Sequence, residues 1–145
     1  MAHEHEAVGV VVVGHGRTAS TLLGAAEGIV GGDALAGVVA VDANVGEDAD
    51  LRTRMCAAAV AADGGAGVLL RADMFGSSPC ACGIRIAEGH PLAVLAGLNL
   101  AMLLKLATLD RRAMSPAELA EACAGSGRRA IAVTLPKPPQ PPEHA

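Results

Sequence analysis

Residues 8–16 read Val-Gly-Val-Val-Val-Val-Gly-His-Gly, an apolar run that ends in a histidine between two glycines. A short, continuous, valine-rich run is typical of a strand buried on both faces, as in a parallel sheet. The glycines end this strand, and Thr18 or Ser20 is expected to cap a helix that continues to Gly31. A buried strand followed directly by a helix predicts an α/β fold.

The alternation of strand and helix continues along the chain. Further strands are expected at 37–42, 66–71, 92–96 and 130–135, and further helices at 47–62, 80–88, 100–109 and from 116. This order predicts an open, mainly parallel four-stranded sheet with helices on both faces, followed by a short C-terminal strand. One domain is expected over 8–135, between a disordered N-terminus at 1–7 and a disordered Pro-rich tail at 136–145.

The composition of the 145-residue chain argues against several classes of function. It has no Trp, no Tyr and one Phe, which argues against base stacking, and its net charge of −4 argues against binding to nucleic acid. The N-terminal residues lack the apolar region of a secretory signal, so a cytoplasmic location and free cysteine thiols are expected. The uncharged stretch at 91–104 is too short for a membrane span, so membrane insertion is not expected.

The candidate functional residues follow the predicted strands, because ligands of open parallel sheets bind beyond the carboxyl ends of the strands. These loops carry His15, Asp42 with Asn44, Asp73 and Asn99. His15 is distinctive because its two glycine neighbours leave the imidazole open to a large partner. A solvent-facing turn histidine is the ordinary structural interpretation of the same residue.

A second motif, Asp73-Met-Phe-Gly-Ser-Ser-Pro79, follows the third predicted strand. If the first and third strands are neighbours, the Asp73 carboxylate binds one ring nitrogen of His15 and leaves the other as a free lone pair. Pro79 suits the first position of a helix, and the amides of residues 76–78 then suit an anion such as phosphate. Taken alone, the motif is also consistent with an ordinary capped helix start. Together with His15 it predicts phosphoryl transfer through a phosphohistidine.

On these residues the chain resembles enzyme IIA of the mannose-type sugar phosphotransferase system. The resemblance covers residues 8–134 and is carried by 10–16, by 73–79 and by Ala96-Gly-Leu-Asn-Leu-Ala-Met102. It implies a cytosolic phosphocarrier that takes a phosphoryl group from the phosphocarrier HPr and passes it to a IIB protein, with no cofactor and no metal. It also implies a homodimer in which the C-terminal strand crosses to the partner subunit.

The same resemblance assigns roles to individual residues. His15 matches the phosphorylated histidine, Asp73 the aspartate that orients it, and Ser78 a serine near the phosphoryl oxygens. Ser77 and Gly76 are further candidates for phosphoryl binding. The pocket or partner surface is expected to include Gly14, Gly16, Arg17, Phe75, Asn99 and Met102. Phe75 stands where relatives carry Trp, and it either plugs the end of the sheet or forms an apolar wall of the pocket.

Other interpretations stay open at this point. The chain is also consistent with a regulator that reports its phosphorylation state to a target such as a sensor kinase, rather than serving sugar uptake. A third possibility within the same chemistry is the phosphotransfer subunit of dihydroxyacetone kinase. Cys80 and Cys82 are consistent with packing residues or with a thiol or metal module.

Overall fold

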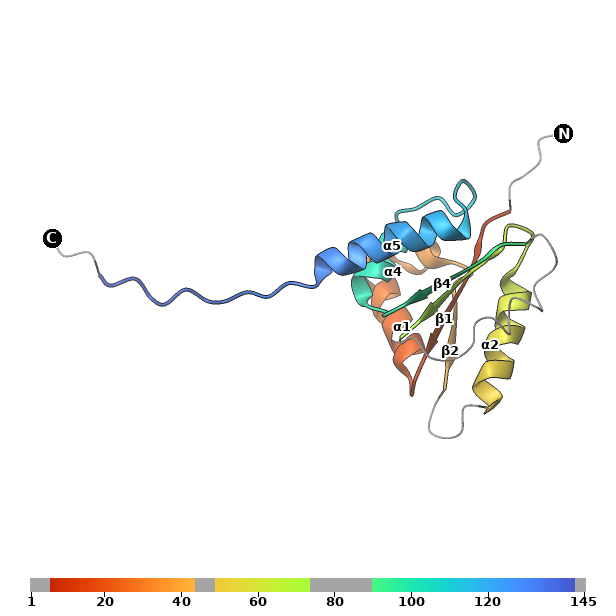
Figure 1. Ribbon diagram of the computed structural model, residues 1–145, viewed down its shortest axis with the longest axis horizontal. Helices are drawn as coiled ribbons and strands as arrows, with labels where there is room; N and C mark the ends of the chain where they lie inside the picture. Colours follow the sequence, from red (N-terminus) through yellow and green to blue (C-terminus); the bar gives the residue numbers. More distant parts are fainter. Residues whose placement is uncertain (1–5, 44–48, 74–89, 143–145) are drawn as a thin grey trace.

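A computed structural model describes residues 6–43, 49–73 and 90–142 of the chain. These residues form three layers, with a central sheet between helices (Figure 1). Helices α1, α4 and α5 cover one face of the sheet and α2 covers the other. A separate cluster of buried apolar side chains lies on each face. The predicted α/β fold with helices on both faces is therefore confirmed.

The sheet has four parallel strands in the order β2-β1-β3-β4, with the bounds β1 Gly9–Gly14, β2 Val39–Asp42, β3 Val68–Ala72 and β4 Leu92–Ala96. The central strand β1 is buried along its whole length, as its valine run predicts. The strands β2, β1 and β3 are parallel neighbours. The residues that follow them therefore lie close together beyond the carboxyl ends of the strands.

The described helices are α1 Thr18–Val30, a short 3-10 helix η1 at Gly32–Leu35, α2 Ala49–Ala62, α4 Leu100–Leu106 and α5 Pro116–Ala130. The helix predicted at 80–88 lies outside the described residues. Helix η1 was not predicted.

Two of the described helices, α4 and α5, begin with a side-chain cap, whereas the cap predicted for α1 is wrong. Asn99 caps α4 by accepting a hydrogen bond from Met102 N, and Ser115 opens α5 with a full capping box to Glu118. At α1, however, the N-cap residue is Arg17, and its side chain makes no capping hydrogen bond. Ser20, one of the two predicted caps, instead lies in the first turn of α1 and donates to the carboxylate of Asp42, at the end of β2.

Among the described residues, the core contains one charged side chain, which the apolar pattern of residues 66–71 does not predict. Arg71, on β3, is 0% exposed, and its Nη2 donates to Met102 O at 2.9 Å. Its Nε and Nη1 find no hydrogen-bond partner among the described residues. Burial lowers the pKa of this guanidinium, because the charged form loses its hydration.

The two cysteines among the described residues differ in their bonding. Cys123 is a free, buried thiol in α5, and burial raises its pKa. Cys56 is also buried but is disulfide-bonded, so the expectation of a free thiol is wrong at this position. Cys80 and Cys82 lie outside the described residues.

The chain leaves the domain after α5. Residues 131–142 have no regular secondary structure and extend away from the sheet (Figure 1). Among the described residues the segment predicted as a C-terminal strand has no strand partner, and its apolar side chains Ile131, Val133 and Leu135 are exposed. No helix among the described residues is long and apolar enough to cross a membrane.

Candidate functional site

The carboxyl ends of β1 and β3 bring together two side chains that are 58 residues apart in the sequence. His15 Nδ1 lies 3.0 Å from Asp73 Oδ2 and 3.2 Å from Asp73 Oδ1. The backbone N–H of His15 also donates to Asp73 Oδ2 at 2.8 Å. The predicted juxtaposition of His15 and Asp73 is confirmed, and the carboxylate holds both the backbone and the ring of the histidine.

This geometry fixes the tautomer of the imidazole. An ionised carboxylate only accepts hydrogen bonds, so the proton between the two groups belongs to Nδ1 of His15. The lone pair of the neutral ring is then on Nε2. The His15 side chain is 57% exposed and that of Asp73 is 21% exposed, so the ring is accessible while its carboxylate partner is largely covered. The arrangement is suited to nucleophilic attack by Nε2 on a group carried by another molecule.

Both glycines beside His15 have a local structural reason. Gly16 has φ +55°, a left-handed conformation that side chains disfavour. A Cβ atom at Gly14 would lie 3.0 Å from Thr18 Cβ and 3.0 Å from Ala19 N, so a side chain there would push against the start of α1. The glycines therefore allow the tight turn that presents His15, in addition to the open access expected from the sequence.

A second carboxylate lies on the other side of the same turn. Asp42 ends β2 and is in register with Gly14 of β1. Its Oδ1 accepts the backbone N–H of Ser20 at 3.0 Å, and its Oδ2 accepts the Ser20 hydroxyl. The sequence placed Asp42 in a candidate loop but gave no sign of its partner, because the pairing depends on the register between β1 and β2.

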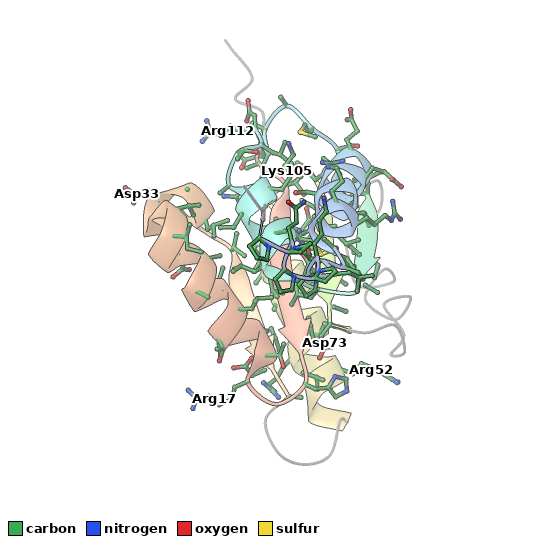
Figure 2. The ribbon with its side chains drawn as sticks, turned by 90° about the vertical axis from the view of Figure 1, so that its left-hand side faces the viewer. Arg17, Asp33, Arg52, Asp73, Lys105 and Arg112 are labelled. Atoms are coloured by element: carbon green, nitrogen blue, oxygen red, sulfur yellow. The ribbon has the colours of Figure 1, made fainter. Side chains whose placement is uncertain are left out.

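Two arginines lie at the same end of the molecule as His15 and Asp73. Figure 2 shows Arg17 and Arg52 on either side of Asp73, while Asp33 and Arg112 lie toward the opposite end. Arg17 precedes α1, and Arg52 is in the first turns of α2; both are exposed. Arg17 was predicted at the rim of the site, whereas Arg52 was not.

The other candidate residues either line a separate cavity or lie outside the described residues. Asn99 and Met102 line a cavity of about 110 Å³ at the end of β4. There Asn99 Nδ2 donates to Gly127 O at 3.1 Å, in addition to capping α4. The candidates in the Asp73 motif beyond the aspartate itself, Phe75, Gly76, Ser77 and Ser78, are outside the described residues.

Comparisons with known proteins show the family of the chain. A family model described as the phosphotransferase system fructose IIA component (EIIA-man) matches residues 9–124. The mannose/sorbose-specific IIA subunit of the phosphotransferase system from Enterococcus faecalis is 30% identical, with a TM-score of 0.65; the match covers 92% of this chain and 100% of that one. No curated protein sequence matches significantly.

More distant structures share the fold. The phosphotransferase system component EIIA from Streptococcus agalactiae has a TM-score of 0.73 at 21% identity, over 87% of this chain and 96% of that one. The IIA protein associated with the fucose utilization operon of Streptococcus pneumoniae has a TM-score of 0.65 at 18% identity, over 90% of this chain and 96% of that one. With the family match over residues 9–124 and the 30% identical IIA subunit, the chain belongs to the mannose- and fructose-type IIA components of the phosphotransferase system.

Proposed function

We propose that this protein is a phosphocarrier that accepts a phosphoryl group from phospho-HPr on His15 Nε2 and passes it to a IIB protein. The observation that carries the proposal is the contact of His15 Nδ1 with Asp73, which leaves Nε2 as the exposed nucleophile. Membership of the IIA family supports the phosphocarrier role within a phosphotransferase system.

The proposed transfer is a direct displacement. The lone pair of His15 Nε2 forms a new P–N bond while the P–N bond to the donor's histidine breaks, and the donor nitrogen keeps the bonding electron pair. The His15 ring gains positive charge as this happens. The Asp73 carboxylate, 3.0 Å from Nδ1, compensates that charge and keeps the Nδ1 proton in place. In the second half of the cycle a nucleophile of the IIB protein takes the phosphoryl group from Nε2.

We assign the phosphoryl oxygens to the loop that follows Asp73. Gly76, Ser77 and Ser78 precede Pro79, a residue suited to the first position of a helix. Free amides at a helix start favour an anion, and the Ser78 hydroxyl adds a further donor. Arg17 and Arg52 are exposed at the same end of the molecule and add positive charge around the incoming group (Figure 2).

We also propose that the protein is a homodimer that exchanges its C-terminal segment. Among the described strands β4 is at the edge of the sheet and pairs only with β3. Residues 131–135 carry exposed apolar side chains at alternate positions, Ile131, Val133 and Leu135, which is the pattern of a strand with one buried face. Addition of this segment to the open β4 edge of a second copy would cover both surfaces.

Labelling from phosphoenolpyruvate tests the phosphocarrier role. The chain is incubated with enzyme I, HPr and labelled phosphoenolpyruvate, and the acid-labile phosphate on it is counted. We expect labelling of the wild type and none of His15→Gln. The matched control is His90→Gln, which removes the ring of another histidine bonded to a carboxylate, Asp63. Equal labelling of wild type and His15→Gln would overturn the proposal.

Addition of a IIB protein tests the second half of the cycle. Labelled chain is separated from HPr and mixed with purified IIB protein. We expect the label to leave His15 and appear on the IIB protein. Label that stays on the chain with every IIB protein of the same organism would contradict the transfer role and favour a regulatory one.

A further inference from the structure

The start of helix α1, which follows His15 directly, lacks a cap of its own. Its N-cap residue Arg17 makes no side-chain capping bond, although the first backbone N–H groups of a helix have no partner within the helix. Asp42 supplies the missing acceptor from β2. Its carboxylate takes the N–H of Ser20, the third residue of the helix, and also the Ser20 hydroxyl. A carboxylate at this position also interacts favourably with the positive end of the helix dipole.

Backbone hydrogen bonds connect the capped first turn of α1 to His15. The backbone N–H of Thr18 donates to His15 O at 3.0 Å, so the first turn of α1 and the histidine are joined. The carboxylate itself is fixed because Asp42 is in register with Gly14, and Ala43 N donates to Gly14 O at 2.9 Å.

We propose that Asp42 is a positioning residue for His15. The turn that carries the histidine is held by one carboxylate on each side. Asp73, after β3, binds the histidine itself. Asp42, at the end of β2, binds the helix that follows it. This inference rests on the proposed function, in which the direction of Nε2 decides the rate of transfer.

The test compares Asp42, which binds the start of α1, with Asp33, an aspartate near the other end of that helix. Asp42→Ala should lower kcat for phosphoryl transfer from phospho-HPr by roughly 10- to 100-fold with KM unchanged, because misplacement of a nucleophile by about 1 Å has an effect of this size. Asp42→Asn should restore most of the rate, since its amide oxygen still accepts the Ser20 N–H. The control is Asp33→Ala, in η1 near the far end of α1 (Figure 2), which should keep the wild-type rate.

A second readout does not depend on phosphoryl transfer. The ¹⁵N chemical shifts of the His15 ring in the unphosphorylated protein report its tautomer and its hydrogen bond to Asp73. We expect these shifts to change in Asp42→Ala and to be unchanged in Asp33→Ala. Wild-type ring shifts together with a wild-type rate in Asp42→Ala would overturn the positioning role. If Asp42→Ala does not fold, Ser20→Pro takes its place, since it removes the N–H that Asp42 accepts and proline is tolerated in the first turn of a helix. Wild-type ring shifts and a wild-type rate in a folded Ser20→Pro would likewise overturn the proposal.

The two proposals fail in different ways. If wild-type protein takes no label from phospho-HPr, the phosphocarrier proposal fails while the ring shifts still decide the role of Asp42. If the wild type is labelled and Asp42→Ala is labelled equally fast with unchanged ring shifts, only the positioning role fails.

Discussion

His15 and Asp73 are joined by both backbone and side chain: the His15 N–H lies 2.8 Å, and its ring Nδ1 3.0 Å, from the same oxygen, Oδ2 of Asp73. A carboxylate that held only the ring would leave the backbone N–H of His15 without this acceptor. With both contacts, the direction of Nε2 follows from the position of β3, the strand that ends just before Asp73. The nucleophile is therefore oriented by the sheet.

Loss of this carboxylate should slow phosphoryl transfer without unfolding the domain. Asp73→Asn keeps an acceptor for the His15 N–H but removes the negative charge that stabilises the ring as it becomes cationic. We expect a fall of roughly 10²–10³-fold in kcat, the size seen when one electrostatic contact to a developing charge is removed. Rapid-quench measurement of transfer from phospho-HPr checks this, with circular dichroism as the control for folding. A wild-type rate in a folded variant would contradict the assigned role.

The contact between Asp63 and His90 should make stability depend on pH in the acid range. Burial alone would raise the pKa of Asp63, but the hydrogen bonds from His90 and from the Gly65 and Gly67 amides lower it below the ordinary 3.8. Because the folded pKa is the lower one, this stabilisation is present above the ordinary pKa of the unfolded chain and is lost as the pH falls through the folded value.

Urea unfolding at a series of pH values measures this effect. The free energy of unfolding of the wild type should decline from about pH 5 downwards. Asp63→Asn should reduce that slope and lower the stability at neutral pH by about 1 kcal/mol, since the partly buried donors of Gly67 and His90 lose their charged acceptor. Some slope remains in this variant, because hydrogen bonds from Ser115 also lower the pKa of Glu118. An unchanged slope would show that Asp63 contributes nothing to it.

Replacement of the buried Arg71 should stabilise the protein. Its guanidinium is charged, completely buried and satisfied at only one nitrogen among the described residues. Arg71→Met fills a similar volume without the cost of desolvating a charge, so we expect unfolding to require about 1–3 kcal/mol more free energy. Arg129→Met, at an exposed position of α5, is the control and should change little. A loss of stability in Arg71→Met would indicate that the guanidinium has an anionic partner in the native assembly.

If the C-terminal segment is exchanged between two subunits, a single charged substitution within it should disrupt the dimer. Sedimentation equilibrium of the wild type should give twice the 14.4 kDa mass of the chain. Val133→Asp places a carboxylate on the face that would pack on the partner, so we expect the mass to fall to that of one chain. Val60→Asp adds the same charge at an exposed valine of α2, on the other side of the sheet, and should remain dimeric. A monomeric wild type would rule out the exchange.

The main features of the fold and the central pair were predictable from the sequence for a simple reason. In a parallel sheet the apolar runs give the ends of the strands, and the polar residues just beyond them share one edge. This logic was sufficient to bring His15 and Asp73 together. Element ends were less predictable because they depend on backbone detail. Gly67 has φ +90° and lies against Pro91, so β3 begins at Val68 instead of 66. Helix α4 ends at Leu106 instead of 109, because Thr108 N donates to Lys105 O and tightens the last turn.

The features that were missed depend on three-dimensional pairing. Asp42 finds Ser20 only through the register of β2 against β1, and Ser20 therefore does not act as the helix cap that its sequence position favours. Arg71 is buried although an arginine at the end of an apolar run normally marks the surface. Its burial follows from its register on the face of β3 that α4 and α5 cover, where Met102 O accepts its hydrogen bond.

The most direct test of the account is to locate the phosphoryl group on the phosphorylated chain. ³¹P and ¹⁵N NMR of the protein labelled from phospho-HPr distinguish the two ring nitrogens of a phosphohistidine. Because Nδ1 of His15 is bound to Asp73, we expect one phosphoryl group, on His15 Nε2. A phosphoryl group on Nδ1 of His15, or on any other residue, would contradict it.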